Sequence, residues 1–144
     1  MIVQPYLFFD GQCEAALDFY KAALGAEVEM MMRFGEAPPA PDGAASEGCG
    51  PGPGAQNADK IMHASFRVGD TVIMASDGNC GEAPKFDGFS LSITVSDVAT
   101  CNRVFAALGD GGAVIQPVMA TFFSPAFGMV RDKFGVSWMI LVYG

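Results

Sequence analysis

The sequence predicts an α+β fold built from two βαβββ modules, at about residues 1–78 and 86–144. Short apolar runs typical of strands surround two segments whose apolar residues recur at helical spacing, and this order of elements occurs twice along the chain. The tetrapeptide Ala22-Ala23-Leu24-Gly25 also recurs as Ala106-Ala107-Leu108-Gly109 at the end of each predicted helix. The repeated order and the repeated tetrapeptide together indicate an internal duplication.

The first module is expected to begin with a strand at Val3–Phe9, which ends at Asp10-Gly11. An amphipathic helix follows, and Gly25 is expected to end it in a left-handed conformation. The apolar stripe of this helix consists of Cys13, Ala16, Leu17, Tyr20, Ala23 and Leu24. The other strands are predicted at Ala26–Phe34, Ile61–Val68 and Thr71–Ser76, the last two joined as a hairpin by Gly69-Asp70.

The second module repeats this order. A strand at Phe89–Val95 leads to Asp97, which can cap a helix, and Gly109 is expected to end that helix as Gly25 ends the first. The remaining strands are predicted at Ala113–Met119, Gly128–Asp132 and Ser137–Tyr143. Modules of about 70 residues have small cores. We therefore expect both to belong to one domain, 1–144, and to share a curved mixed sheet with helices on its outer face and a concave cleft.

Residues 35–59 separate two strands of the first module and are rich in Pro, Gly, Ala, Asn and Ser. Such a composition offers almost nothing to bury, so we expect a long, exposed, flexible loop. The sequence leaves open whether this loop is disordered or acts as a lid over a site.

The composition argues against several classes of function. The chain carries 8 basic and 16 acidic residues, a formal net charge of -8, which disfavours binding to nucleic acid or to an anionic membrane surface. No apolar run approaches the roughly 20 residues that cross a bilayer, and the N-terminus lacks the basic and apolar regions of an export signal. We therefore expect a soluble, cytoplasmic protein without nucleic-acid or membrane partners.

The cysteines are spaced too widely and irregularly for a zinc knuckle or a dithiol redox motif. They are Cys13, Cys49, Cys80 and Cys101. Cys13 and Cys101 lie on the apolar stripes of the two predicted helices, where a reduced cysteine behaves as a small hydrophobic residue. We expect both to be buried thiols.

A series of short motifs covers nearly the whole chain outside the loop. In order, they are Pro5–Phe9, Ala15–Tyr20, Leu24–Ala26, Ile61–Ala64, Gly69-Asp70, Met74–Asp77 and Phe127–Trp138. Together they resemble the vicinal-oxygen-chelate superfamily and, within it, the PhnB-like branch related to glyoxalases and bleomycin-resistance proteins. The resemblance implies a cleft for a small organic molecule and pairing as a homodimer. Some relatives carry a methyltransferase label, but the sequence has no glycine-rich loop between a strand and a helix, so we predict no cofactor.

The resemblance also implies where a catalytic metal would bind, with one ligand from the first and one from the last strand of each module. The corresponding residues are Gln4, Met74, Ser90 and Met139. Met139 follows an Asp-x-x-Gly turn, Asp132 to Gly135, and stands where relatives commonly carry a glutamate. Hard divalent ions prefer oxygen or imidazole ligands, whereas thioethers suit soft ions such as Cu(I). We therefore predict no metal centre of the glyoxalase type.

His63, the only histidine, is one of two candidate catalytic residues, and Tyr6 is the other. His63 shares one face of its predicted strand with Ser65 and Arg67. It is either a solvated or hydrogen-bonded strand residue, or a general base on the concave face of the sheet. The sequence leaves both interpretations open.

The predicted ligand-binding residues are mostly those that strand alternation places on the concave face. They are Gln4, Tyr6, His63, Ser65, Met74, Ser90, Ser92, Phe122 and Met139. Phe122 belongs to an aromatic group with Phe123 and Phe127, which could form part of the core or stack on a flat ligand at the cleft. A curved sheet would turn these residues into the lining of a pocket.

Three functions remain in competition. The first is a metal-free protein that binds a small organic molecule, and the acidic character of the chain would suit a cationic one. The second is a glyoxalase-like lyase or isomerase with Gln4, Tyr6 or His63 near the reacting group. The third is a homodimeric domain that acts mainly through protein association, with the adaptable side chains of Met30, Met31 and Met32 at the interface. We favour the first, because only one of the four metal positions offers a suitable donor.

Overall fold

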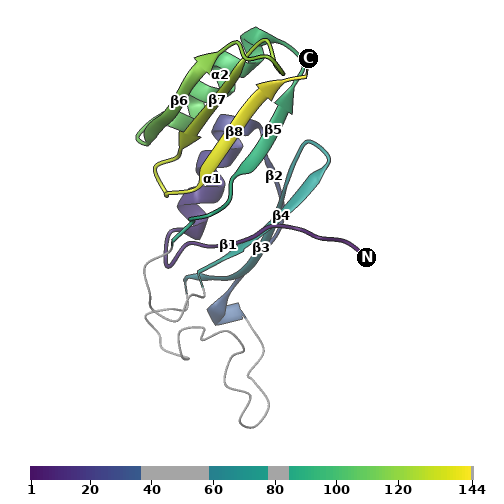
Figure 1. The fold of residues 1–144 in the computed structure, drawn as a ribbon. Coiled ribbons are helices and arrows are strands. Elements are labelled where there is room, and N and C mark those ends of the chain that lie inside the picture. Colours follow the sequence, from purple (N-terminus) through teal and green to yellow (C-terminus); the bar gives the residue numbers. More distant parts are fainter. Residues whose placement is uncertain (37–58, 78–84, 144) are drawn as a thin grey trace. The chain divides into compact units, whose positions relative to one another are not determined.

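The computed structural model describes residues 1–36, 59–77 and 85–143. Most of the predicted loop, together with Cys49 and Cys80, lies outside these residues. The chain divides into two compact units, Met1–Pro84 (unit 1) and Lys85–Gly144 (unit 2), and each has the element order βαβββ (Figure 1). The predicted α+β fold of two modules is therefore confirmed. A shared curved surface with a concave cleft stays a prediction.

Unit 1 is a mixed four-stranded sheet with one long helix. Its elements are β1 (Tyr6–Phe8), α1 (Cys13–Leu24), β2 (Glu27–Arg33), a 3-10 turn (Phe34–Glu36), β3 (Ile61–Val68) and β4 (Thr71–Ser76). The strand order is β1-β4-β3-β2. β1 runs parallel to β4, and the other pairs are antiparallel.

Unit 2 repeats this arrangement. Its elements are β5 (Leu91–Val95), α2 (Val98–Gly109), β6 (Ala113–Met119), β7 (Phe127–Arg131) and β8 (Ser137–Val142). The strand order is β5-β8-β7-β6, with β5 parallel to β8 and the other pairs antiparallel. The two sheets therefore have the same topology, as an internal duplication requires.

The first strand of each unit is shorter than predicted. β1 begins at Tyr6 instead of Val3, so the prediction that Gln4 belongs to it is wrong. Pro5 has no N–H to donate to a neighbouring strand, and residues 1–4 are exposed. In unit 2, β5 begins at Leu91, so Ser90 immediately precedes the strand.

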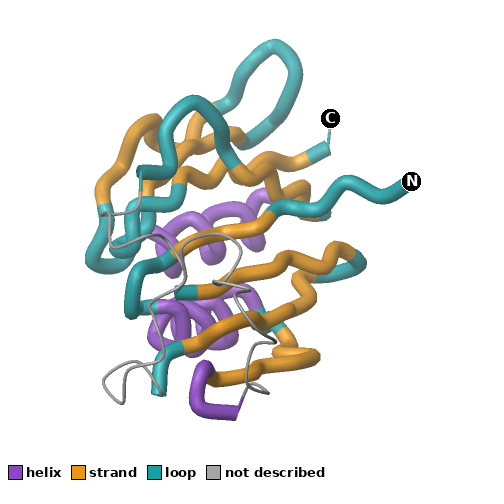
Figure 2. The backbone as a smooth tube through the Cα atoms, turned by 90° about the horizontal axis from the view of Figure 1, so that it is seen from below, coloured by secondary structure: helices purple, strands orange, loops and turns teal. Residues whose placement is uncertain are grey.

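Each helix covers one face of its own sheet (Figure 2). In unit 1 the buried Tyr20 of α1 stacks on Phe66 of β3, with ring centroids 5.7 Å apart. In both units a buried cysteine of the helix faces the sheet, and Cys13 and Cys101 are free thiols, as predicted. Desolvation raises the pKa of both thiols, and for Cys13 the nearby Asp77 adds to the effect. We call the sheet face opposite the helix the open face of each unit.

The ends of the two helices differ. α1 ends at Gly25, whose φ of 68° is left-handed and whose N–H donates to the carbonyl of Lys21, as predicted. The prediction that Gly109 ends α2 in the same way is wrong, because Gly109 is still helical and the left-handed glycine is Gly111. A Cβ on Gly109 would lie 3.1 Å from Val130, so this glycine allows close packing against the sheet.

Two buried aspartates hold the connections between elements. Asp77, which follows β4, accepts hydrogen bonds from the backbone N–H groups of Gly11 (2.7 Å), Cys13 (2.9 Å) and Ile61 (2.8 Å). It thereby joins the start of α1 to β3 and β4. The N-cap residue of α1, Gln12, makes no side-chain capping bond, so Asp77 takes over this role. The bond from the N–H of Cys13 to Asp77 joins residues that are 64 positions apart in the sequence.

Asp132 organises the predicted Asp-x-x-Gly turn between β7 and β8. Its carboxylate accepts from the N–H groups of Phe134 (2.9 Å) and Val136 (3.0 Å) and from the indole of Trp138 (2.9 Å). Gly135 is left-handed, with φ 96°. The turn leads β8 into the core at Trp138, which is 1% exposed.

Candidate functional site

The open faces of the two sheets can be compared residue by residue, because both sheets have the same register around one methionine. Met74 on β4 and Met139 on β8 occupy the same place. From β1 to β2 the row in unit 1 is Tyr6, Met74, Ser65 and Met30. From β5 to β6 the row in unit 2 is Ser92, Met139, Met129 and Gln116. The next position along β3 and β7 is His63 in unit 1 and Phe127 in unit 2.

The open face of unit 1 carries four of the nine predicted ligand-binding residues. They are Tyr6, His63, Ser65 and Met74. The Tyr6 hydroxyl lies 2.9 Å from Nδ1 of His63, and either atom can be the donor. The two rings are 5.5 Å apart between centroids, and Phe8 lies 5.0 Å from Tyr6. His63 is thus hydrogen-bonded, and it lies on the same face as Ser65, as alternation predicted. A role as a general base stays a prediction.

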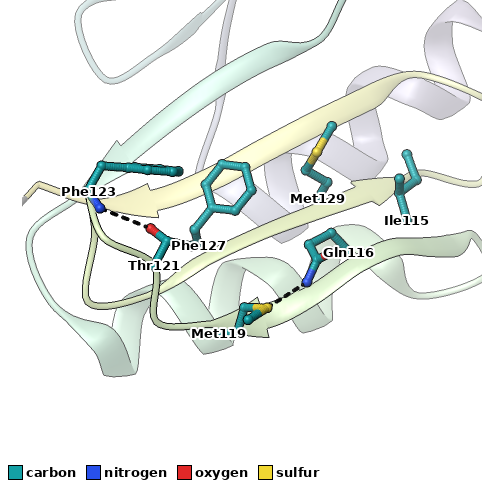
Figure 3. A pocket seen from close by; sticks show the side chains of 7 residues that line it. All are labelled: Ile115, Gln116, Met119, Thr121, Phe123, Phe127 and Met129. Atoms are coloured by element: carbon teal, nitrogen blue, oxygen red, sulfur yellow. Dashed lines mark hydrogen bonds between the residues drawn. The ribbon is translucent and has the colours of Figure 1, made fainter.

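The open face of unit 2 holds a pocket with a volume of about 340 Å³. It is lined by Ile115, Gln116, Met119, Thr121, Phe123, Phe127 and Met129 (Figure 3). The rings of Phe123 and Phe127 meet edge to face at 5.2 Å. The lining is therefore mostly aromatic and aliphatic.

A bulge in β6 aims two consecutive side chains at this pocket. Val114 pairs with Val130 and Gln116 pairs with Met129, so Ile115 is an additional residue on β6. Side chains of successive strand residues normally point to opposite faces, and a bulge can redirect one of them. A second irregularity follows at Pro117, which an edge strand such as β6 tolerates because its outer side needs no partner.

The loop between β6 and β7 closes one end of the pocket. The hydroxyl of Ser124 lies 2.8 Å from the carbonyl of Ala126 and 2.7 Å from that of Val142, which ties the loop to β8. Thr121 Oγ1 accepts from the N–H groups of Phe123 (3.4 Å) and Ser124 (3.1 Å). These bonds hold the Phe123 ring beside Phe127 (Figure 3).

Among the described residues, two polar side chains, Gln116 and Thr121, and no charged one, line the pocket. The amide nitrogen of Gln116 donates to Pro117 O (3.2 Å) and lies 2.9 Å from Met119 Sδ. Among the residues that the structure describes, the amide oxygen of Gln116 has no hydrogen-bond partner. It can therefore accept a hydrogen bond from a ligand.

The other predicted site residues do not line this pocket, although Met139 is directly opposite the lining residue Met129. Gln4 is exposed ahead of β1, and Ser90 is bonded to Ser137 through their hydroxyl oxygens, 2.6 Å apart. Ser92 and Met139 pair on the open face of unit 2. Phe122 is fully exposed at 100%, so its interpretation as a core residue is wrong. None of the nine predicted residues lines the pocket.

The pocket was missed in the sequence analysis for three reasons. Phe127 and Met129 alternate along β7 as the open-face residues of the other strands do. This strand was predicted to begin at Gly128, so Phe127 was left outside it. Ile115 carries no comparable signal, because a bulge depends on how β6 pairs with β7. Phe123 was considered only as a core or stacking residue.

The four positions implied for a metal do not fit a hard divalent ion. Met74 and Met139 offer thioethers, which are soft donors, and the hydroxyl of Ser90 is already bonded to Ser137. Within residues 1–36, 59–77 and 85–143, no three His, Cys, Asp or Glu side chains come together as a metal-binding group. A function without a metal of this type remains a prediction.

Comparison with known proteins identifies the relatives of this chain. A family model described as 3-demethylubiquinone-9 3-methyltransferase matches residues 2–141. Protein YjdN of Escherichia coli (strain K12) is 37% identical over 143 residues, which cover 99% of this chain and 95% of that protein. The crystal structure of protein PA1353 from Pseudomonas aeruginosa is 36% identical, with a TM-score of 0.81, and covers 99% and 98% of the two chains.

A further solved structure is a putative 3-demethylubiquinone-9 3-methyltransferase, PhnB protein, from Bacillus cereus, with 25% identity, a TM-score of 0.74 and 99% coverage of both chains. Fold and relatives define the class, which is the PhnB-like branch of the vicinal-oxygen-chelate superfamily. The chain belongs to the family described as 3-demethylubiquinone-9 3-methyltransferase. That activity is not assigned to this chain, whose sequence lacks a glycine-rich loop between a strand and a helix. In the described part of the chain, no helix has the length and apolar character needed to cross a membrane.

Proposed function

We propose that this protein binds a small, uncharged and largely apolar organic molecule in the pocket on the open face of unit 2. The observation that carries the proposal is the lining itself, in which aromatic, methionine and isoleucine side chains surround one amide and one hydroxyl. Small-molecule sites are typically apolar clefts of about 300–1,000 Å³ with a few polar groups that orient the ligand. Binding, without a catalytic metal, is the function that this lining supports best.

The lining argues against the cationic ligand that the overall charge had suggested. A net charge of -8 attracts cations over long distances. Inside the pocket, however, none of the described lining residues carries a carboxylate, so a cationic ligand would gain no ion pair there. The pocket therefore favours a neutral ring system that donates one hydrogen bond to Gln116.

The experiment uses two fluorescent probes with the same aromatic skeleton. N-phenyl-1-naphthylamine is neutral, and 1-anilinonaphthalene-8-sulfonate adds a sulfonate. We expect the neutral probe to bind with increased fluorescence and the sulfonate to bind more weakly. Absence of binding by the neutral probe, or equal affinity for both probes, would contradict the proposal.

Two neighbouring residues of β6 offer a matched pair of variants. Ile115 lines the pocket and is 46% exposed, whereas Val114 does not line it and is 56% exposed. Ile115→Gln should weaken binding of the neutral probe about tenfold, which corresponds to roughly 1.4 kcal/mol of lost apolar contact. Val114→Gln should leave the affinity unchanged. Equal effects of the two variants would place the probe elsewhere.

A glyoxalase-like lyase or isomerase is the second candidate, favoured by the Tyr6–His63 hydrogen bond of 2.9 Å on the open face of unit 1. A phenol and an imidazole held together can move a proton next to a carbonyl group. The assay would use methylglyoxal with glutathione, with and without EDTA. Turnover that resists EDTA and is lost in His63→Ala would support this candidate. Turnover that appears only after addition of Ni or Zn would show that a metal is required.

A homodimer in the cytoplasm is also part of the proposal. β2 is an edge strand of its sheet, and Met31, which is 38% exposed, offers an adaptable apolar contact for a second copy. Sedimentation at micromolar concentration should give the mass of a dimer, and a monomer would refute it.

A further inference from the structure

We propose that the open face of unit 1 binds a soft monovalent cation, such as Cu(I), through three thioethers and one imidazole. The four side chains are those of Met30, Met32, His63 and Met74. This site lies in the other unit from the pocket and does not depend on the function proposed for that pocket. It also differs from the glyoxalase-type metal centre, which requires donors for a hard ion, because thioethers are soft donors.

The strand register brings the four side chains to one face. Met32 on β2 is directly opposite His63 on β3, a relation that places Cβ atoms about 5 Å apart. Ser65 on β3 has Met30 of β2 as its partner on one side and Met74 of β4 as its partner on the other. Ser65 and His63 point to the same face because they are two residues apart on β3. The small Ser65 side chain leaves space above the sheet, into which flexible thioethers can converge.

The hydrogen bond between Tyr6 and His63 orients the imidazole for this role. It occupies Nδ1 at 2.9 Å, and no other hydrogen bond reaches the ring from the residues described. When Nδ1 carries the proton and donates it to the Tyr6 oxygen, Nε2 presents a free lone pair. Histidines that bind metals usually hold their second ring nitrogen in a hydrogen bond of this kind.

The chemistry of the donors selects the ion. Thioethers prefer Cu(I) and similar soft ions over Mg, Mn or Zn, and they need no deprotonation to bind. Met30 is 39% exposed, and Met32, His63 and Met74 are partly exposed, so an ion can reach them. Arg67 points to the same face, but its charge is neutralised by an ion pair with Glu27. In unit 2, Gln116 and Phe127 replace Met30 and His63, so we expect no such site there.

The experiment uses Ag(I), which mimics Cu(I) without redox chemistry, added as nitrate to the full chain in chloride-free buffer. All samples carry Cys49→Ser and Cys80→Ser, because these thiols lie outside the described residues and would compete for the ion. Cys13 and Cys101 can stay, because both are buried and desolvation raises the pKa of each thiol. The readout is NMR of the ¹³C-labelled methyl groups of the nine methionines, assigned with single Met→Leu variants.

We expect the methyl signals of Met30, Met32 and Met74 to shift together and to stop shifting at one Ag(I) per chain, while those of Met129 and Met139 stay in place. Tyr6→Phe keeps all four ligands and should weaken the affinity about tenfold. His63→Gln should remove the saturation at one equivalent. Unchanged signals of the three methionines, or equal shifts in both units, would overturn the proposal.

Discussion

The open faces of the two units differ in chemistry although their strands share one register. Unit 1 carries His63 and Ser65 where unit 2 carries Phe127 and Met129, and only the central methionine is common to both. The result is a phenol–imidazole pair with thioethers in unit 1 and an apolar pocket in unit 2. The two units therefore share their side-chain directions, while the different residues at those positions make the two faces chemically different.

Even an irregular feature is shared by the two units. β2 contains an additional residue, Glu29, between Val28 and Met30, at the same place as Ile115 between Val114 and Gln116 on β6. Both bulges lie on edge strands. A carboxylate at this position in unit 1 and an isoleucine in unit 2 agree with the polar and apolar character of the two faces.

The starts of the helices show a second difference. The N-cap of α2 is local, since Asp97 accepts from the N–H of Thr100 at 2.7 Å. The start of α1 is instead stabilised by Asp77, far away in sequence. A distant cap also joins strands, so its loss should affect much more than one helix end.

The largest expected effect tests this difference between the caps. Asp77→Ala leaves the N–H groups of Gly11, Cys13 and Ile61 without their acceptor, and we expect a loss of about 3–5 kcal/mol in unfolding free energy. Asp97→Ala should cost clearly less, because water can reach the exposed N–H groups at the start of α2. Urea unfolding followed by circular dichroism measures both. Equal losses would show that Asp77 acts only as a cap.

The next prediction converts one residue of unit 2 to its counterpart in unit 1. Phe127→His removes an aromatic wall of the pocket, and we expect the affinity for N-phenyl-1-naphthylamine to fall about 10- to 100-fold. His63→Phe, the reverse change in unit 1, should leave the affinity unchanged. Fluorescence titration of both variants provides the comparison. An effect of His63→Phe as large as that of Phe127→His would locate the probe on unit 1.

A smaller effect concerns the packing of the helix on its sheet. A Cβ on Gly128 would lie 2.9 Å from the Phe105 ring and from Val118, whereas unit 1 accommodates Ala64 at the same position. Gly128→Ala should lower the unfolding free energy by about 1–2 kcal/mol through overpacking. Fluorescence of Trp138, the only tryptophan, reports unfolding of unit 2. In a Phe105→Ala background the cost of Gly128→Ala should decrease, and an unchanged cost would rule out this contact as its cause.

The smallest effect depends on pH. The hydrogen bonds of Glu14 with Arg33, 2.5 and 3.2 Å long, lower the pKa of the Glu14 carboxyl. The ionised carboxylate therefore stabilises the fold above the usual glutamate pKa, about 4.3, and this stabilisation is lost as the pH falls through the lowered value. Since water reaches both side chains, which are 28% (Arg33) and 50% (Glu14) exposed, Glu14→Gln should cost only about 0.5 kcal/mol at pH 7.

Thermal unfolding of the wild type and Glu14→Gln between pH 7 and pH 3 tests this sign. The difference between the two proteins should shrink as the pH falls. A difference that grows toward low pH would mean that burial, which acts in the opposite direction, controls this carboxyl.

Much of the fold could be predicted from residues that are neighbours in sequence. The cap at Asp97, the left-handed end at Gly25, the Asp132 turn and the strands Ile61–Val68, Thr71–Ser76 and Ala113–Met119 were all predicted correctly. Alternation also placed Tyr6, His63, Ser65 and Met74 on one face. These features depend on local backbone preferences and on the two-residue period of a strand, and both are visible in the order of residues.

Tertiary structure decided what depends on which distant segments meet. Asp77 reaches the start of α1, Gly109 packs against Val130, and the bulge at Ile115 forms only when β6 pairs with β7. The sequence by itself therefore determined the modules and the direction of most side chains. The pocket and the distant cap needed the pairing of strands, because their contacts join residues that no local pattern connects.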